Sequence, residues 1–67
     1  MIELREKIEV EVQSLTALIK EAHGKMRKYW QNRATAMMAG FFNIGLLTSD
    51  EYFAAIEHFI AVACEEN

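Results

Sequence analysis

The chain has 67 residues, of which 52% are hydrophobic, with no proline and three glycines. A chain of this length forms at most one domain and buries a smaller share of its surface than larger proteins do. Its single cysteine, Cys64, excludes an internal disulfide, and no cysteine or histidine cluster has the spacing of a zinc site. We therefore predict one all-helical domain over residues 1–67 that gains stability by oligomerisation, and we expect no metal or other cofactor.

The composition also bears on the compartment. Residues 1–11 alternate acidic, basic and aliphatic side chains, unlike the basic start and apolar middle of a secretion signal. The uncharged segment 34–47 holds fourteen residues, fewer than the ~20 needed to cross a bilayer. We expect a cytoplasmic protein that does not insert into membranes. A reducing compartment suits the unpaired Cys64, which we expect to be buried near a helix end.

Charge is unevenly distributed along the chain. The net charge of −3 divides into −2 over residues 1–19, +4 over residues 20–33 and −5 over residues 34–67. Such segregation indicates that oppositely charged segments pair with each other or with partners.

Apolar residues recur at steps of three and four from Leu4 to Trp30 and again at Met37, with Arg33 in the position between, which marks one face of a helix. The pattern keeps its phase past Gly24, and no Ser, Thr, Asp or Asn follows Gly24 to cap a new helix. We therefore predict a continuous helix that ends near Asn43 or Ile44. In the alternative, the chain breaks at Gly24 and folds as a monomeric three-helix bundle.

A second helix begins after a tight corner. Gly45 suits the left-handed position that follows a helix end, while Thr48 and Glu51 have the spacing of a capping box. These signals predict a shorter helix from about Ser49 to Cys64 that runs antiparallel to the first. We expect its buried residues to be Tyr52, Phe53, Ile56, Phe59, Ile60 and Ala63.

The two predicted helices differ in length. At 1.5 Å per residue, the first would span about 60 Å and the second about 24 Å, so most of the apolar stripe on the first would stay bare. We therefore predict a homodimer that resembles a four-helix bundle, in which acidic residues 3–11 of one chain approach basic residues 25–33 of the other. The predicted dimer interface consists of Leu4, Ile8, Val12, Leu15, Ile19, Ala22, Met26, Trp30, Met37 and Phe41.

The outward side of the shorter helix is acidic and carries small alanines. A flat, negatively charged helical surface can dock onto a basic protein surface, and a merely solvated face is the alternative. The predicted docking residues are Asp50, Ala54, Glu57, His58, Ala61 and Glu65.

The basic segment offers a second function, because cations interleaved with Tyr29 and Trp30 can contact phosphates and stack on bases. The residues concerned are Lys25, Arg27, Lys28 and Arg33. The pI of 5.2 lies far below that of a dedicated nucleic-acid binder, so we keep this function as the alternative. No glycine-rich phosphate loop or pair of buried carboxylates is evident, and we predict that the chain is not an enzyme.

The corner Gly45-Leu46-Leu47-Thr48-Ser49-Asp50-Glu51-Tyr52-Phe53 is similar to the turn G-L-[IL]-[ST]-x-[DE]-E-[YF] of many short helical proteins of phages and plasmids. The similar segment covers about a seventh of the chain. The resemblance implies an accessory protein that binds and modulates a host protein, as inhibitors of bacterial defence do, and it assigns no role to any residue. We therefore predict a non-enzymatic protein-binding module, a small homodimeric regulator or inhibitor of a host protein.

Overall fold

Gly24 divides the predicted long helix in two. A computed structural model describes residues 2–65, and in it the backbone of Gly24 has φ 59° and ψ −128°. Glycine adopts this conformation readily, whereas residues with a side chain rarely do. Helix α1 spans Ile2–Glu21 and helix α2 spans Lys25–Asn43. The predicted continuous helix is therefore wrong, and the alternative break at Gly24 is the one that the chain adopts.

The side chain of Arg27 stabilises this break. Its Nε donates to the backbone carbonyls of Ile19 and Ala22 at 3.1 and 3.2 Å, and its Nη2 donates to the carbonyl of Lys20 at 3.1 Å. Carbonyls at a helix C-terminus lack intrahelical partners and form the negative end of the helix dipole. Cations that follow Gly24 would ordinarily be unfavourable at the positive end of a new helix. Arg27 instead folds back and neutralises the end of α1.

Helix α3 spans Ser49–Cys64, as predicted. The corner before it contains Gly45 with φ 82°, which confirms the predicted left-handed position. The backbone N–H of Leu46 donates to the carbonyl of Phe41 at 2.9 Å, which is the longer hydrogen bond of a Schellman motif. This motif ends α2 and turns the chain back along it.

The predicted capping box at the start of α3 is confirmed. The backbone N–H of Glu51 donates to Thr48 Oγ1 at 3.2 Å, and the backbone N–H of Thr48 donates to Glu51 Oε1 at 2.9 Å. Arg5 of α1 also binds the Glu51 carboxylate, at 2.6 Å. These contacts hold the pKa of Glu51 below its ordinary value because they favour the ionised carboxylate. The hydrogen bond from the Thr48 backbone N–H has the largest effect on this pKa. The capping box therefore also ties α1 to α3.

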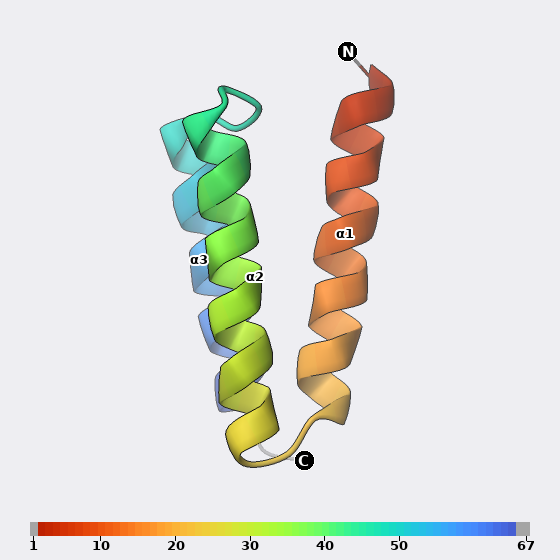
Figure 1. Ribbon diagram of the computed structural model, residues 1–67, viewed down its shortest axis with the longest axis vertical. Coiled ribbons are helices and arrows are strands. Elements are labelled where there is room, and N and C mark those ends of the chain that lie inside the picture. Colours follow the sequence, from red (N-terminus) through yellow and green to blue (C-terminus); the bar gives the residue numbers. More distant parts are fainter. Residues whose placement is uncertain (1, 66–67) are drawn as a thin grey trace.

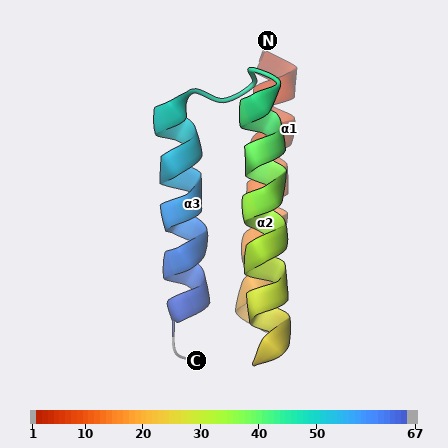
Figure 2. The same ribbon diagram turned by 60° about the vertical axis from the view of Figure 1, so that its left-hand side comes forward.

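The three helices lie side by side, and each contacts the other two (Figure 1). Consecutive helices are antiparallel, because α1 and α2 join at one end of the bundle and α2 and α3 at the other. In Figure 2, α1 lies behind α2, so the view is onto the side of α2 and α3 that faces away from α1. Residues 2–64 are all-helical apart from the two connections, and none of these helices has the length and apolarity of a membrane span.

Each helix contributes two residues to the buried core. This core consists of Leu15, Ile19, Ala34, Met38, Phe59 and Val62.

Most of the predicted dimer interface packs inside a single chain. Three of its members are buried there, namely Ile8, Leu15 and Ile19. Four more pack against the core, namely Val12, Trp30, Met37 and Phe41, while Ala22 is half-buried. Only Leu4 and Met26 of this set are exposed. Because α2 folds back onto α1, the stripe is not bare, so the premise of the predicted interface is wrong. Dimerisation itself stays a prediction.

The buried side of α3 differs in part from the predicted one. Phe59 is buried as expected, but Phe53 and Ile60 are 60% and 45% exposed, and Val62 is buried in their place. The buried face contains Ala55, Phe59 and Val62, which are spaced by four and three residues and so lie on one side of the helix. This side faces both α1 and α2. Two large apolar side chains are left on the outside.

Candidate protein-docking surface

One side of α3 is exposed along its whole length. We define the outer face of α3 as Asp50, Phe53, Ala54, Glu57, Ile60, Ala61 and Cys64, all of which are exposed. Steps of three and four residues place them on one continuous strip of the helix. The strip carries two carboxylates and neither lysine nor arginine, so its charge is negative.

All six predicted docking residues are exposed. Four of them belong to the outer face of α3, and the other two lie at its borders. At one border, the Thr16 hydroxyl donates to the carbonyl of Val12 at 2.7 Å, so it accepts from His58 Nε2, 2.9 Å away. At the C-terminal border, the carbonyl of Glu65 accepts from Arg27 Nη1. Both residues therefore also join α3 to the rest of the bundle.

Sequence reasoning missed the apolar part of this surface. It assigned Phe53 and Ile60 to the core because they are large, and it predicted that Cys64 is buried, whereas all three are exposed. The buried face of α3 could have been recognised from the spacing of Ala55, Phe59 and Val62. This spacing is easily overlooked because alanine is small. An exposed apolar patch bordered by charged residues is typical of a protein-binding surface.

The outer side of α2 has the opposite charge. We define the outer face of α2 as Lys25, Lys28, Tyr29, Asn32, Arg33, Ala36, Gly40 and Asn43, all of which are exposed. Helix α2 contains no aspartate or glutamate. Of the four cations predicted to contact nucleic acid, Lys25, Lys28 and Arg33 lie on this face, whereas the donors of Arg27 bind backbone carbonyls. The structure therefore gives Arg27 a role in the fold.

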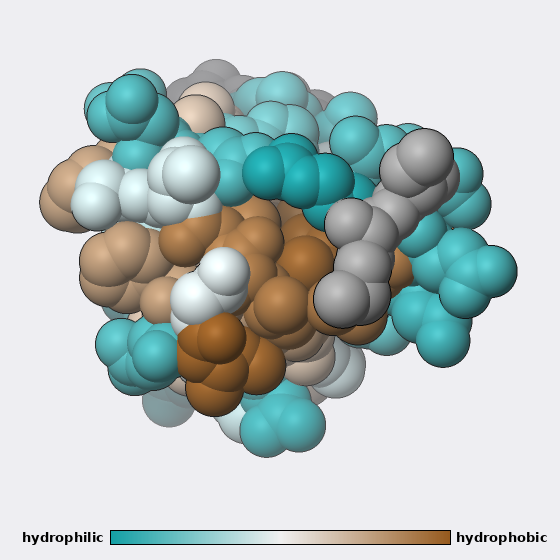
Figure 3. All heavy atoms as spheres, turned by 90° about the horizontal axis from the view of Figure 1, so that it is seen from above, coloured by the Kyte–Doolittle hydropathy of each residue, from teal (hydrophilic) through white to brown (hydrophobic). Residues whose placement is uncertain are grey.

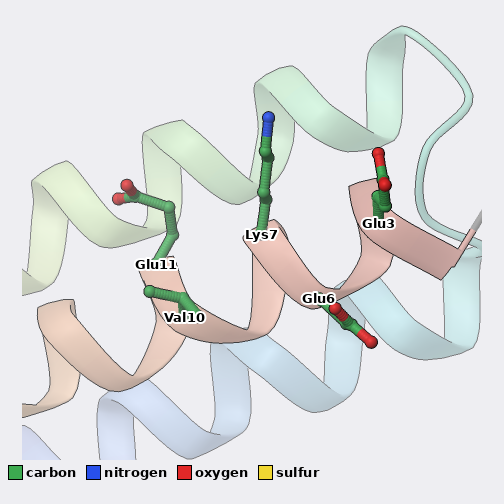
Figure 4. Close-up of a pocket in the computed structure, with 5 residues that line it drawn as sticks. All are labelled: Glu3, Glu6, Lys7, Val10 and Glu11. Atoms are coloured by element: carbon green, nitrogen blue, oxygen red, sulfur yellow. The ribbon is translucent and has the colours of Figure 1, made fainter.

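A hollow of about 580 Å³ lies along α1. It is lined by Glu3, Glu6, Lys7, Val10 and Glu11 (Figure 4). In Figure 4, Glu3, Lys7 and Glu11 extend to one side of the helix and Glu6 extends to another. Ligand pockets are enclosed by several elements, whereas this hollow is the open surface of one helix.

Another hollow lies at the end of the bundle where α2 turns into α3. Seen from this end, apolar side chains gather in the middle and hydrophilic ones surround them (Figure 3). Ile44 is 70% exposed in the corner. The hollow of about 240 Å³ is lined by Leu4, Arg5, Ile8, Gly45 and Leu46. Its volume is below the roughly 300 Å³ at which small-molecule sites begin.

Chemistry-bearing side chains are dispersed over the bundle. Within residues 2–65, no three His, Cys, Asp or Glu side chains gather in a way that could hold a metal ion. No model of a known protein family matches this chain, and neither the curated proteins nor the solved structures include a match.

Proposed function

We propose that this chain is a non-enzymatic protein-binding module that acts as a small regulator or inhibitor of another protein. The observation that carries the proposal is the outer face of α3, where Phe53 and Ile60 stand exposed beside the carboxylates of Asp50 and Glu57. Apolar anchors supply binding energy, and surrounding charges select the partner.

The composition of this face defines the chemistry of the partner. Complete burial of one Phe or Ile side chain contributes about 1.5–3 kcal/mol, and Phe53 and Ile60 have about half of that still to gain. A partner helix with an apolar stripe flanked by lysine or arginine would cover both anchors and face both carboxylates. Together the two anchors contribute about 1.5–3 kcal/mol, a minor part of the roughly −8 kcal/mol of a 1 μM complex, so charge pairing and the rest of the interface supply the remainder.

Two further observations support a proposal for the biological role and the compartment of this module. The corner at residues 45–53 is similar to that of small phage and plasmid proteins, which supports an accessory role in a mobile element. The thiol of Cys64 is exposed, and an exposed unpaired thiol is maintained in a reducing compartment such as the cytoplasm. The proposed regulator therefore acts on a cytoplasmic host protein.

A labelled amphipathic peptide of about 20 residues, with leucine on one face and lysine on the other, is a direct probe of this function. We expect its fluorescence anisotropy to rise on titration with the chain, and we expect Glu57→Lys with Ala61→Arg to weaken binding at least tenfold. A peptide with glutamate in place of lysine should not bind, and Glu6→Lys on α1 is the matched charge control. Equal binding of the wild type and the double variant would contradict the proposal.

One observation favours a second candidate function. On the outer face of α2, Tyr29 is 49% exposed and lies among Lys25, Lys28 and Arg33, so a ring and three cations share one surface. This arrangement could contact single-stranded nucleic acid. A mobility-shift titration at low salt tests it, with Lys25→Glu and Lys28→Glu combined as the variant. Absence of a shift, or a shift that the variant does not reduce, eliminates this candidate.

A further inference from the structure

The exposed apolar side chains of α3 lie on the flank of this helix that borders α2. The opposite flank borders α1, because Glu51 and His58 bind side chains of α1. With 3.6 residues per turn, Phe53 lies about 200° around α3 from Glu51. Ile60 lies about 200° around the helix from His58 for the same reason. Both apolar side chains therefore face away from α1, on the side of the bundle that is turned toward the viewer in Figure 2.

Helix α2 contributes small side chains and a cation to the same side. The rings of Phe42 and Tyr52 stack with their centroids 4.9 Å apart, so Phe42 marks the flank of α2 that borders α3. Three residues, Lys28, Thr35 and Ala39, lie within about 60° of Phe42 around α2 and farther from the buried face. Of these, Lys28 is exposed, whereas Thr35 and Ala39 are half-buried. We define the α2–α3 side by these three residues together with Phe53, Ile60 and Cys64 of α3.

The two halves of the α2–α3 side carry opposite charges. The α3 half is bordered by the exposed carboxylates of Asp50 and Glu57. The α2 half holds the exposed cations Lys25 and Lys28, and α2 contains no aspartate or glutamate. The salt bridge within residues 2–65 joins other side chains, so these four charges form no ion pair among the described residues. Arg33 lies about 140° around α2 from Lys28 and belongs to another side of the bundle.

The opposite charges are also separated along the bundle. Because α2 and α3 are antiparallel, the stacked rings of Phe42 and Tyr52 set which residues share a level. At 1.5 Å per residue, Asp50 lies next to this contact, and Glu57 lies about 8 Å along the bundle from it. Lys28 lies about 21 Å from the same contact. The α2–α3 side is therefore acidic near the corner between the helices and basic near its other end.

We propose that the α2–α3 side binds one helix of a partner protein, as a fourth helix of the bundle, and that this helix is basic at one end and acidic at the other. The inference rests on the proposed function, because it keeps the anchors of α3 and adds α2 to the contact. An apolar stripe on the partner helix covers Phe53 and Ile60, and the small side chain of Ala39 lets the helix approach α2. Its basic end lies at Glu57, and its acidic end lies at Lys28.

The charge pattern disfavours a second copy of this chain as the occupant. A twofold axis parallel to the helices keeps every residue at its own level, so Lys28 of one copy would lie about 13 Å along the bundle from Glu57 of the other. A twofold axis across the helices would place α3 on α3, and the carboxylates of the two copies would repel each other. A separate helix with its own charge order meets neither obstacle.

Two labelled peptides with the same leucine stripe test the proposal by fluorescence anisotropy. One is the leucine-lysine peptide, and the other, the split peptide, carries glutamate in its N-terminal half and lysine in its C-terminal half, which suits its own helix dipole. We expect the split peptide to bind at least fivefold more tightly than the leucine-lysine peptide. Lys28→Glu should weaken binding of the split peptide at least fivefold. Arg33→Glu makes the same charge change on the same helix, so it is the matched control and should alter the Kd less than twofold.

Energy transfer measures the orientation of the bound peptide. An acceptor dye is attached to His23→Cys in a Cys64→Ser background, because residue 23 is exposed at the end of the bundle where α1 and α2 join. A donor dye on the acidic end of the split peptide should transfer energy more efficiently than a donor on its basic end. Equal transfer from both ends, or stronger transfer from the basic end, contradicts the proposed charge pairing.

The remaining outcomes separate this proposal from the proposed function. Equal binding of the two peptides, or equal effects of Lys28→Glu and Arg33→Glu, overturns the α2–α3 site, while binding of the leucine-lysine peptide preserves the proposed function. If neither peptide binds, both fail. Self-association that excludes the split peptide, detected by sedimentation velocity, would assign this side to a second copy and also overturn the proposal. Circular dichroism verifies that the variants are folded, since the substituted side chains are exposed.

Discussion

Arg27, in the first turn of α2, donates from Nε to the backbone carbonyl of Ile19, in the last turn of α1, at 3.1 Å. Its Nη1 also donates to the carbonyl of Glu65, which directly follows α3. One guanidinium therefore binds the ends of two helices from the start of the third. This contact explains how the chain turns at Gly24 although no capping side chain follows that glycine.

Arg27→Ala should lower the free energy of unfolding by about 1–3 kcal/mol, because it leaves several backbone carbonyls without their charged donor. Urea denaturation followed by circular dichroism measures this loss. Arg33→Ala removes the same kind of side chain from an exposed position of the same helix, so it should change the free energy of unfolding by less than about 0.5 kcal/mol. Equal effects of the two variants would show that Arg27 does not hold the helix ends.

Gly24→Ala and Gly40→Ala should act in opposite directions. Gly24 has φ 59°, where an L-residue is strained, so alanine should destabilise the fold by about 1–3 kcal/mol. Gly40 lies inside α2, where a Cβ finds open space, so alanine should stabilise the fold by about 1 kcal/mol. Urea midpoints of the two variants provide the comparison. Stabilisation by Gly24→Ala would instead indicate the continuous helix.

The two phenylalanines of α3 should differ sharply in their effect on stability. Phe59 is fully buried among the three helices, so Phe59→Ala should cost about 3–5 kcal/mol. Phe53 is exposed, so Phe53→Ala should change the free energy of unfolding by less than about 0.5 kcal/mol in dilute solution. Thermal or urea unfolding at low concentration measures both. A comparable loss for Phe53→Ala would place that ring in the core.

Much of the fold follows from local signals in the sequence. The corner at Gly45 and the capping box of Thr48 and Glu51 were predictable because each depends on residues within a few positions of one another. The break at Gly24 was not, because it depends on Arg27 reaching back to carbonyls up to eight residues earlier in the chain. The apolar residues keep the same helical spacing on both sides of Gly24, but this indicates only that both helices face the same core.

The candidate site could be predicted only in its polar half. Asp50 and Glu57 were expected outside because charge strongly favours solvent. The exposure of Phe53 and Ile60 could not be derived from hydrophobicity, since both lie beside the true buried series. The packing of α1 and α2 against α3 determines which apolar side chains of α3 are covered. Because the chain breaks at Gly24, this packing differs from that of the predicted continuous helix.

Acidification should weaken the capping box. The folded-state pKa of Glu51 lies below its ordinary value of 4.5, chiefly because the Thr48 backbone N–H donates to its carboxylate. The stabilisation is therefore present above about pH 4.5 and is lost as the pH falls through the lowered folded-state pKa. Glu51→Gln should flatten this part of the stability profile, measured by urea denaturation over the acidic range. An unchanged acidic profile in this variant would contradict the assignment.

Phe53 lies outside the core, and we propose that it anchors a protein partner. Fluorescence anisotropy, under conditions where the variant is folded, measures the affinity of Phe53→Ala for the leucine-lysine peptide. We predict that Kd rises at least tenfold, about 1.4 kcal/mol, relative to the wild type. An unchanged Kd would contradict this role of Phe53.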